Sequence, residues 1–114
     1  MDWIEIIQLR TSTRTDCNAA VAAFHELSSP GQENGLEDII LLRNPVLDTD
    51  MEIFICWRGD VPQGGKSGLG LQLASAFSEY GRIYHSVWRY ETSLMMKQEA
   101  KRISNPGRNC GGFL

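Results

Sequence analysis

Cysteine is scarce in this chain, and long hydrophobic runs are missing. The three cysteines, Cys17, Cys56 and Cys110, cannot all pair with one another, and none lies in a C-x-x-C motif or at a ligand spacing from a histidine. We therefore expect free thiols, no bound metal and a cytoplasmic location. No apolar run approaches the roughly 20 residues that span a bilayer, and the first residues are acidic where a signal peptide is basic. No membrane association is expected either.

An excess of positive charge is also missing. Eleven Lys and Arg residues stand against 14 Asp and Glu residues, which gives a formal net charge of −3. Such a chain repels the phosphates of nucleic acid, so nucleic acid is not expected as a partner. The length of 114 residues is that of a single domain, and the 42% hydrophobic fraction is close to the globular average.

Hydrophobic spacing divides the chain into four strand-like and two helix-like segments. The strand-like segments are 3–10, 39–43, 51–58 and 82–91. The first helix is expected after a capping Asp16, and the second from about Ser67 to Tyr80, with Gly81 as its C-cap. Glu5 and Gln8 interrupt the first strand, which we expect to be wet on parts of both faces.

The last residues differ from the rest in composition. The segment 105–114 contains three glycines and a proline and has no periodicity, and 92–103 is compatible with a short amphipathic helix. We therefore predict one domain over residues 1–92 and a C-terminal extension over 93–114.

The order β-α-β-β-α-β is that of an α+β, ferredoxin-like domain, in which a four-stranded antiparallel sheet carries both helices on one face. The other face of the sheet would then expose large apolar side chains. Two such sheets packed face to face across a twofold axis would bury them and enclose a cavity. The alternation alone does not decide which side chains of each strand face the helices. We expect a homodimer, a dimeric α/β barrel.

The third strand carries a family resemblance. The element order, the length and the segment Ile53-Phe54-Ile55-Cys56-Trp57-Arg58, where a tryptophan ends the strand before the second helix, resemble the dimeric α/β-barrel superfamily that includes the antibiotic-biosynthesis monooxygenases. The resemblance covers about residues 3 to 91. It departs from the family on the first strand, where only Gln8 could stand for the family's asparagine, and in the second helix, which lacks the usual histidine.

The resemblance implies a barrel interior that binds a small aromatic or polyketide-like molecule, or haem in one branch. Some members of the superfamily oxidise their ligand without a metal or flavin. On this interpretation His85 is the candidate base, because a neutral imidazole can exchange a proton near pH 7. Trp57, Tyr84 and Trp88 are candidate ligand-binding aromatics, and Arg89 could bind an anionic substituent. No cofactor is expected.

Each candidate also has a structural interpretation. His85 could simply hydrogen-bond across the sheet, the tryptophans could pack at an interface, and Arg89 could pair with Glu91. The loop 59–67 joins a strand to a helix but has five residues, not four, between Gly59 and Gly65, so it does not fit a nucleotide-binding loop. It is interpreted as a connection with Ser67 or Gly68 near the helix start.

Two functions therefore remain open. The chain is either a small-molecule-binding homodimer of the monooxygenase-like type, in its enzymatic form a cofactor-independent oxygenase of a small aromatic ligand, or a non-catalytic assembly module whose sheet face only joins subunits.

Overall fold

The computed structural model describes residues 1–30 and 34–96. Its elements follow the order β-α-β-β-α-β, as predicted. They are β1 (Trp3–Arg10), α1 (Arg14–His25), β2 (Leu36–Arg43), β3 (Asp50–Trp57), α2 (Gly68–Phe77) and β4 (Arg82–Arg89).

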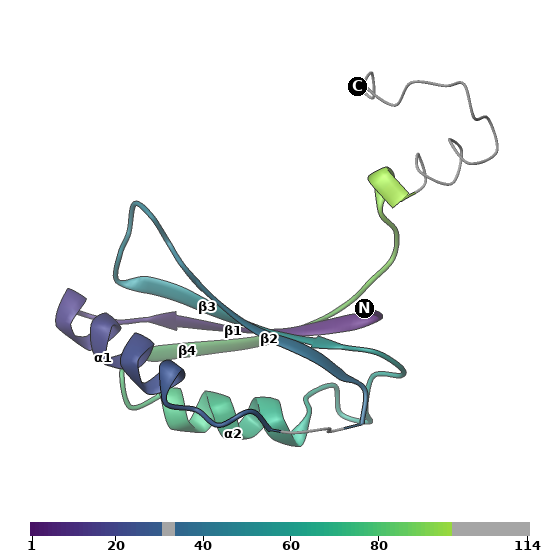
Figure 1. Ribbon diagram of the computed structural model, residues 1–114, viewed down its shortest axis with the longest axis horizontal. Helices are drawn as coiled ribbons and strands as arrows, with labels where there is room; N and C mark the ends of the chain where they lie inside the picture. The colour runs from purple at the N-terminus through teal and green to yellow at the C-terminus, as the bar shows by residue number, and fades with distance from the viewer. Residues whose placement is uncertain (31–33, 97–114) are drawn as a thin grey trace.

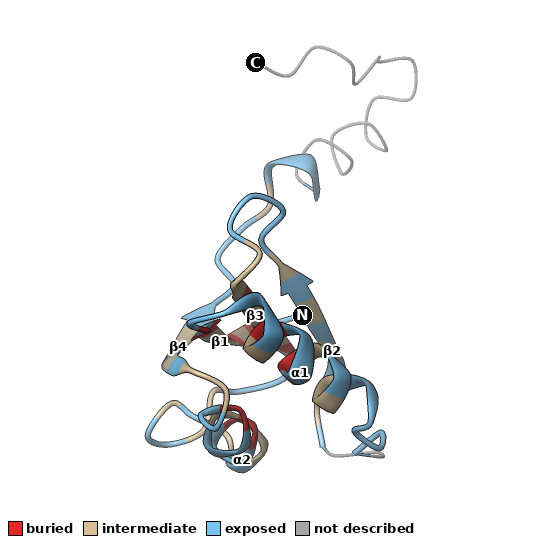
Figure 2. Ribbon diagram, turned by 90° about the vertical axis from the view of Figure 1, so that its left-hand side faces the viewer, coloured by how far each residue is buried: buried red, intermediate tan, exposed pale blue. Residues whose placement is uncertain are grey.

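The four strands form one antiparallel sheet in the order β2-β3-β1-β4. Both helices lie on the same side of this sheet, and its other side carries no element among the described residues (Figures 1 and 2). The predicted ferredoxin-like α+β fold is confirmed. We call the two sides the helix-covered face and the open face.

Strand register settles which side chains face the helices. The buried residues of β1 and β3 alternate with half-buried ones, and Ile7 pairs with both Ile53 and His85. In β4 the residues in register with the buried set of β1 are therefore Ile83, His85, Val87 and Arg89. The helix-covered face holds the core of the domain: Trp3, Ile7, Leu9, Met51, Ile53, Ile55 and Trp57 from the sheet, and Cys17, Ala20, Leu73 and Phe77 from the helices.

The predicted helix caps need partial correction. The N-cap of α1 is Thr13, whose side chain accepts a hydrogen bond from the backbone N–H of Asp16, so Asp16 is capped and does not cap. Ser67, expected near the start of the second helix, is the N-cap of α2. The C-cap of α2 is Ser78, and Gly81 instead precedes β4, where an added Cβ would collide with the backbone of Arg10.

The prediction for the first strand was wrong in one respect. β1 lies inside the sheet between β3 and β4, and its helix-covered face is dry. Glu5 lies on that face and is fully buried, at 0% exposure. Gln8 lies on the open face, where the side chains of β1 are half-buried or exposed.

The described part of the C-terminal segment ends in a helical turn at residues 94–96, where Ser93 Oγ accepts a hydrogen bond from the N–H of Met96. The rest of the predicted helix and the predicted tail lie outside the described residues. Within residues 1–30 and 34–96, no helix is both long enough and apolar enough to cross a bilayer.

Candidate functional site on the helix-covered face

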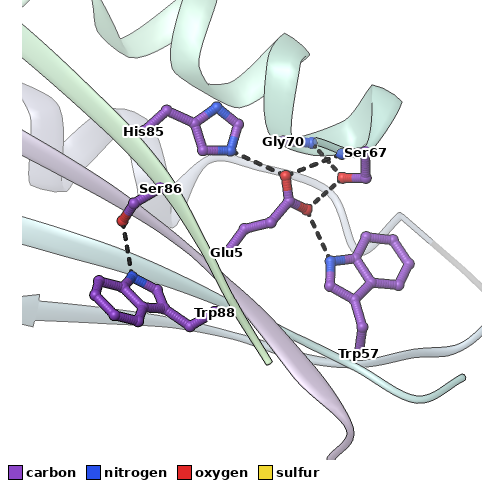
Figure 3. A network of polar contacts seen from close by, with 7 residues as sticks. All are labelled: Glu5, Trp57, Ser67, Gly70, His85, Ser86 and Trp88. Carbon is purple, nitrogen blue, oxygen red and sulfur yellow. Dashed lines mark hydrogen bonds and ion pairs between the residues drawn. The ribbon is translucent and has the colours of Figure 1, made fainter. Parts of the chain in front are cut away.

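A polar network is built around Glu5 inside the apolar core (Figure 3). Glu5 Oε1 accepts the backbone N–H of Ser67 at 3.0 Å and lies 2.9 Å from Nε2 of His85. Glu5 Oε2 accepts the indole N–H of Trp57 at 2.8 Å and the hydroxyl of Ser67. Four groups from β3, β4 and the start of α2 thus converge on one carboxylate.

The number of contacts matches the capacity of the carboxylate. An ionised Glu has two oxygens with about four acceptor positions, and here each oxygen has two partners. A buried carboxyl group is tolerated only when it is fully hydrogen-bonded. Glu5 is therefore an organised part of the core, and all its acceptor positions are in use.

The start of α2 is shaped to receive this carboxylate. Ser67 Oγ accepts the N–H of Gly70 at 2.9 Å while its own hydrogen is directed to Glu5, so one hydroxyl caps the helix and binds the carboxylate. Positive partial charge at the helix N-terminus favours an anion there. A Cβ on Gly70 would overlap the carboxylate of Glu5, so only glycine lets strand and helix approach this closely.

His85 and Trp57 flank the carboxylate. The side chain of His85 is 5% exposed, and its second ring nitrogen, Nδ1, points away from Glu5 (Figure 3). Trp57 is stacked on Trp3, with ring centroids 5.4 Å apart and planes 9° apart. Trp3 Nε1 is a buried donor without a partner among the described residues. This end of the sheet therefore combines an aromatic stack, a saturated carboxylate and an imidazole.

The five residues nominated from the sequence do not lie together. His85 and Trp57 belong to the helix-covered face and meet at Glu5. Tyr84 and Trp88 are 65% and 59% exposed on the open face, where the indole N–H of Trp88 binds Ser86 Oγ at 3.0 Å. Arg89 is exposed at the end of β4, and its pairing with Trp3 assigns it to the helix-covered face.

Sequence reasoning missed the residue at the centre of this network. Glu5 lies on the first strand beside Trp57, and that strand is where the family resemblance calls for an asparagine. Gln8, the substitute nominated from the sequence, lies on the open face and donates to Glu52 Oε1 at 3.1 Å. The sequence did carry one signal: Glu5 alternates in step with Trp3 and Ile7 along the strand. In a buried strand, side chains at such positions all point to the same face.

A cavity of about 530 Å³ opens on the same side of the sheet, between β2 and the two helices. Its floor and walls are mostly apolar, and polar groups line the remainder. The lining side chains include Phe24, Leu27, Leu36, Ile39, Leu69 and Leu73, with Ser28, Ser29, Glu37, Asp38 and Gln72 at the polar positions. A volume of this size is in the range of small-molecule sites.

Two titratable groups near β2 have shifted pKa values. Hydrogen bonds from the Met1 ammonium and from Arg58 lower the pKa of Glu37 below its usual value. On the open face, partial burial raises the pKa of the Cys56 thiol, and the carboxylates of Asp38 and Glu37 add to the increase. Cys17 and Cys56 are both free thiols. Among residues 1–30 and 34–96, no three His, Cys, Asp or Glu side chains are grouped to hold a metal ion.

The sequence matches no family model and no curated protein. Solved structures do match the arrangement of the chain. A dimeric ferredoxin-like protein from an uncultured marine organism superposes with a TM-score of 0.60 over 82% of this chain and 90% of its own length, at 6% identity. A putative antibiotic biosynthesis monooxygenase from Deinococcus radiodurans gives a TM-score of 0.56 over 81% and 95%, at 12% identity.

The chain has the fold of the antibiotic-biosynthesis-monooxygenase-like proteins. A further match is SnoaB, a cofactor-independent oxygenase from Streptomyces nogalater, with a TM-score of 0.51 over 82% of this chain and 98% of SnoaB, at 15% identity. The resemblance inferred from the sequence is thus confirmed for the fold. Structural matches at sequence identities this low establish the fold alone, so the chemistry has to be argued from the side chains of this chain.

Proposed function

We propose that this chain is a small-molecule-binding homodimer and that it acts as a cofactor-independent oxygenase on a small aromatic ligand. The observation that carries the proposal is the pairing of His85 with Glu5 beneath α2, in a fold shared with a cofactor-independent oxygenase. A histidine held by a buried carboxylate is a recurring arrangement for moving protons.

The proposed reaction needs a base and a dry site. His85 would remove the proton of a hydroxyaromatic ligand, and the electron-rich anion would then reduce O₂ with its own electrons. One oxygen atom would enter the ligand as a quinone carbonyl at a ring carbon whose C–H bond breaks, and the other would leave as water with that hydrogen and the proton held by His85. The apolar surroundings would shield the anion from protonation by solvent. Trp57 would form part of the aromatic wall of the site. Its N–H donates to Glu5 and is therefore not free to bind a ligand.

Oxygen uptake tests this function. The purified protein is incubated with a panel of hydroxyaromatic compounds under air and under anaerobic conditions, and His85→Ala is compared with His25→Ala. His25 lies on α1 and is exposed, so its loss should leave the rate unchanged. We expect uptake with at least one compound and a loss of about 100-fold or more in His85→Ala. Equal rates in the two variants would rule out the proposed base.

The homodimer is proposed from the open face. Its exposed apolar side chains include Ile40 (38%), Leu42 (46%), Tyr84 (65%) and Trp88 (59%), and no described residue covers them. Large apolar side chains exposed on one face commonly mark an interaction site, and the ferredoxin-like protein from the marine organism is described as dimeric. A second copy packed on the open face would make Tyr84 and Trp88 interface residues.

A non-catalytic assembly module is the alternative function. The same exposed face favours it, since packing alone would account for Tyr84 and Trp88. This alternative predicts no ligand and no oxygen uptake, and it leaves the dimer intact. Arg89, exposed at the strand end, would then have no ligand to bind. A cytoplasmic location fits either function and is proposed from the free thiols Cys17 and Cys56.

A further inference from the structure

The hydrogen bonds of Glu5 determine where His85 carries its proton. Three donors other than His85 point at the carboxylate: the indole N–H of Trp57, and the backbone N–H and hydroxyl of Ser67. They occupy both positions of Oε2 and one of Oε1. The remaining position of Oε1 faces His85 Nε2 at 2.9 Å. An ionised carboxylate has no hydrogen to give, so the hydrogen in this last contact belongs to Nε2.

The second nitrogen of the ring is then the basic one. A neutral imidazole has one N–H, and with that hydrogen on Nε2 the lone pair is on Nδ1. Nδ1 has no hydrogen-bond partner among the described residues, and it points away from Glu5 (Figure 3). Nδ1 is therefore the ring nitrogen left to accept a proton, in a side chain that is 5% exposed.

We propose that Glu5 is a positioning residue that fixes His85 in the Nε2–H form and presents Nδ1 as the proton-accepting atom. Glu5 can do this because it cannot rotate. Its carboxylate is attached to β3 through Trp57 and to the start of α2 through Ser67, and Gly70 leaves no space behind it. The chemical use of Nδ1 rests on the proposed function, whereas the proton position does not.

Nitrogen-15 NMR of the histidine rings measures this directly in the full chain. Each ring nitrogen reports whether it carries hydrogen, and His25 serves as an exposed reference in the same spectrum. The His85 signals are assigned by their loss in His85→Asn. Between pH 6 and 9 we expect neutral His85 to show only the Nε2–H form, with its hydrogen protected from exchange with water. His25 should show a mixture of forms and rapid exchange.

The dependence on Glu5 is tested with Glu5→Ala, which leaves room for water to satisfy Trp57 and Ser67. Its matched control is Glu79→Ala, which removes an exposed carboxylate. Glu5→Ala should abolish the protection of the Nε2 hydrogen. It should also bring the ratio of the Nε2–H to the Nδ1–H form in His85 to the ratio found in His25, and the control should change neither. A merely structural role for Glu5 would alter stability without altering this ratio.

Three results would overturn the proposal: an Nδ1–H form in neutral His85, a ring that keeps both hydrogens up to pH 9, or an Nε2 hydrogen equally protected in Glu5→Ala. If Glu5→Ala does not fold, the first two still decide the question in the unmodified chain. Failure of the oxygenase is a separate result. An unaltered Nε2–H signal without oxygen uptake would refute the reaction and leave the positioning role in place.

Discussion

The two faces of the sheet differ in the polarity of what they bury and of what they expose. On the helix-covered face a carboxyl group, that of Glu5, is fully buried, and four polar groups surround it. On the open face large apolar side chains such as Tyr84 and Trp88 are exposed, and nothing described covers them. On the first face, the Glu5 carboxylate has partners for all four of its positions within one chain. The open face is incomplete, and a second copy would complete it.

This comparison also separates the proposed roles. A site on the helix-covered face belongs to one chain, so each copy in a dimer would carry its own. The open face would hold the two subunits of the dimer together. Variants on the two faces should therefore have separate effects, with stability and proton position changing on one side and subunit mass on the other.

The largest effect is expected from Trp88→Glu. A glutamate at this position of the open face would place a charge among apolar groups, and we expect the dissociation constant of the dimer to increase by about 100-fold or more. Sedimentation equilibrium over a range of concentrations measures it. Leu71→Glu is the matched control, because Leu71 is 53% exposed on α2, away from the open face. Equal dimer affinity in both variants would mean that the open face is not the interface.

On the helix-covered face, Gly70→Ala should lower the free energy of unfolding by about 1–3 kcal/mol. The new Cβ would overlap a carboxylate that its four donors hold in place, and the higher helix propensity of alanine would offset about 1 kcal/mol at most. Gly68→Ala is the control, since nothing lies within 4 Å of a Cβ there. Urea denaturation compares them, and equal stability of the two variants would contradict the close contact of α2 with Glu5.

A comparable or smaller loss is expected for Ser67→Ala, about 2 kcal/mol, because the hydroxyl both caps α2 and binds Glu5 and each role contributes about 1 kcal/mol. Thr13→Ala removes the cap of α1 alone, so it should cost about 1 kcal/mol. The same denaturation experiment distinguishes them. A loss in Ser67→Ala no larger than that in Thr13→Ala would show that the contact with Glu5 contributes no stability.

The smallest effect concerns Cys56. Burial, with Asp38 and Glu37, raises the pKa of its thiol, so the folded chain retains the proton to a higher pH than the unfolded chain does. The thiol is neutral in both states at neutral pH, and the cost of ionising it in the folded chain appears only as the pH rises above the pKa of the unfolded thiol. Asp38→Asn should increase alkylation of Cys56 at pH 8 by about twofold, and Asp48→Asn should not.

Peptide mapping after alkylation gives the rate at Cys56 separately from the other thiols. The measurement is best made on the Trp88→Glu background, where a second copy no longer covers the open face. An unchanged rate in Asp38→Asn would mean that burial alone, without the neighbouring carboxylates, sets the reactivity of this thiol.

The fold could be predicted from the sequence because its signals are local. The alternation of Met51, Ile53, Ile55 and Trp57 indicates a strand, and Ser67 lies at the predicted start of the second helix. The predicted cap of the first helix was wrong by three residues, because threonine and aspartate are both good caps and only the backbone geometry distinguishes Thr13 from Asp16.

The site could be predicted only in part, because its defining contacts are distant along the chain. Trp57, Ser67 and His85 lie 52, 62 and 80 positions beyond Glu5. A glutamate in a strand usually faces water, and its burial is acceptable only once these donors are in place. His85 and Trp57 could be nominated from their residue types, but the carboxylate that joins them required the register of three strands.

Sedimentation equilibrium of the unmodified chain tests the contrast between the two faces most directly. A complete helix-covered face and an incomplete open face predict a species of twice the monomer mass at micromolar concentration. A stable monomer under these conditions would contradict the assignment of the open face to a second copy.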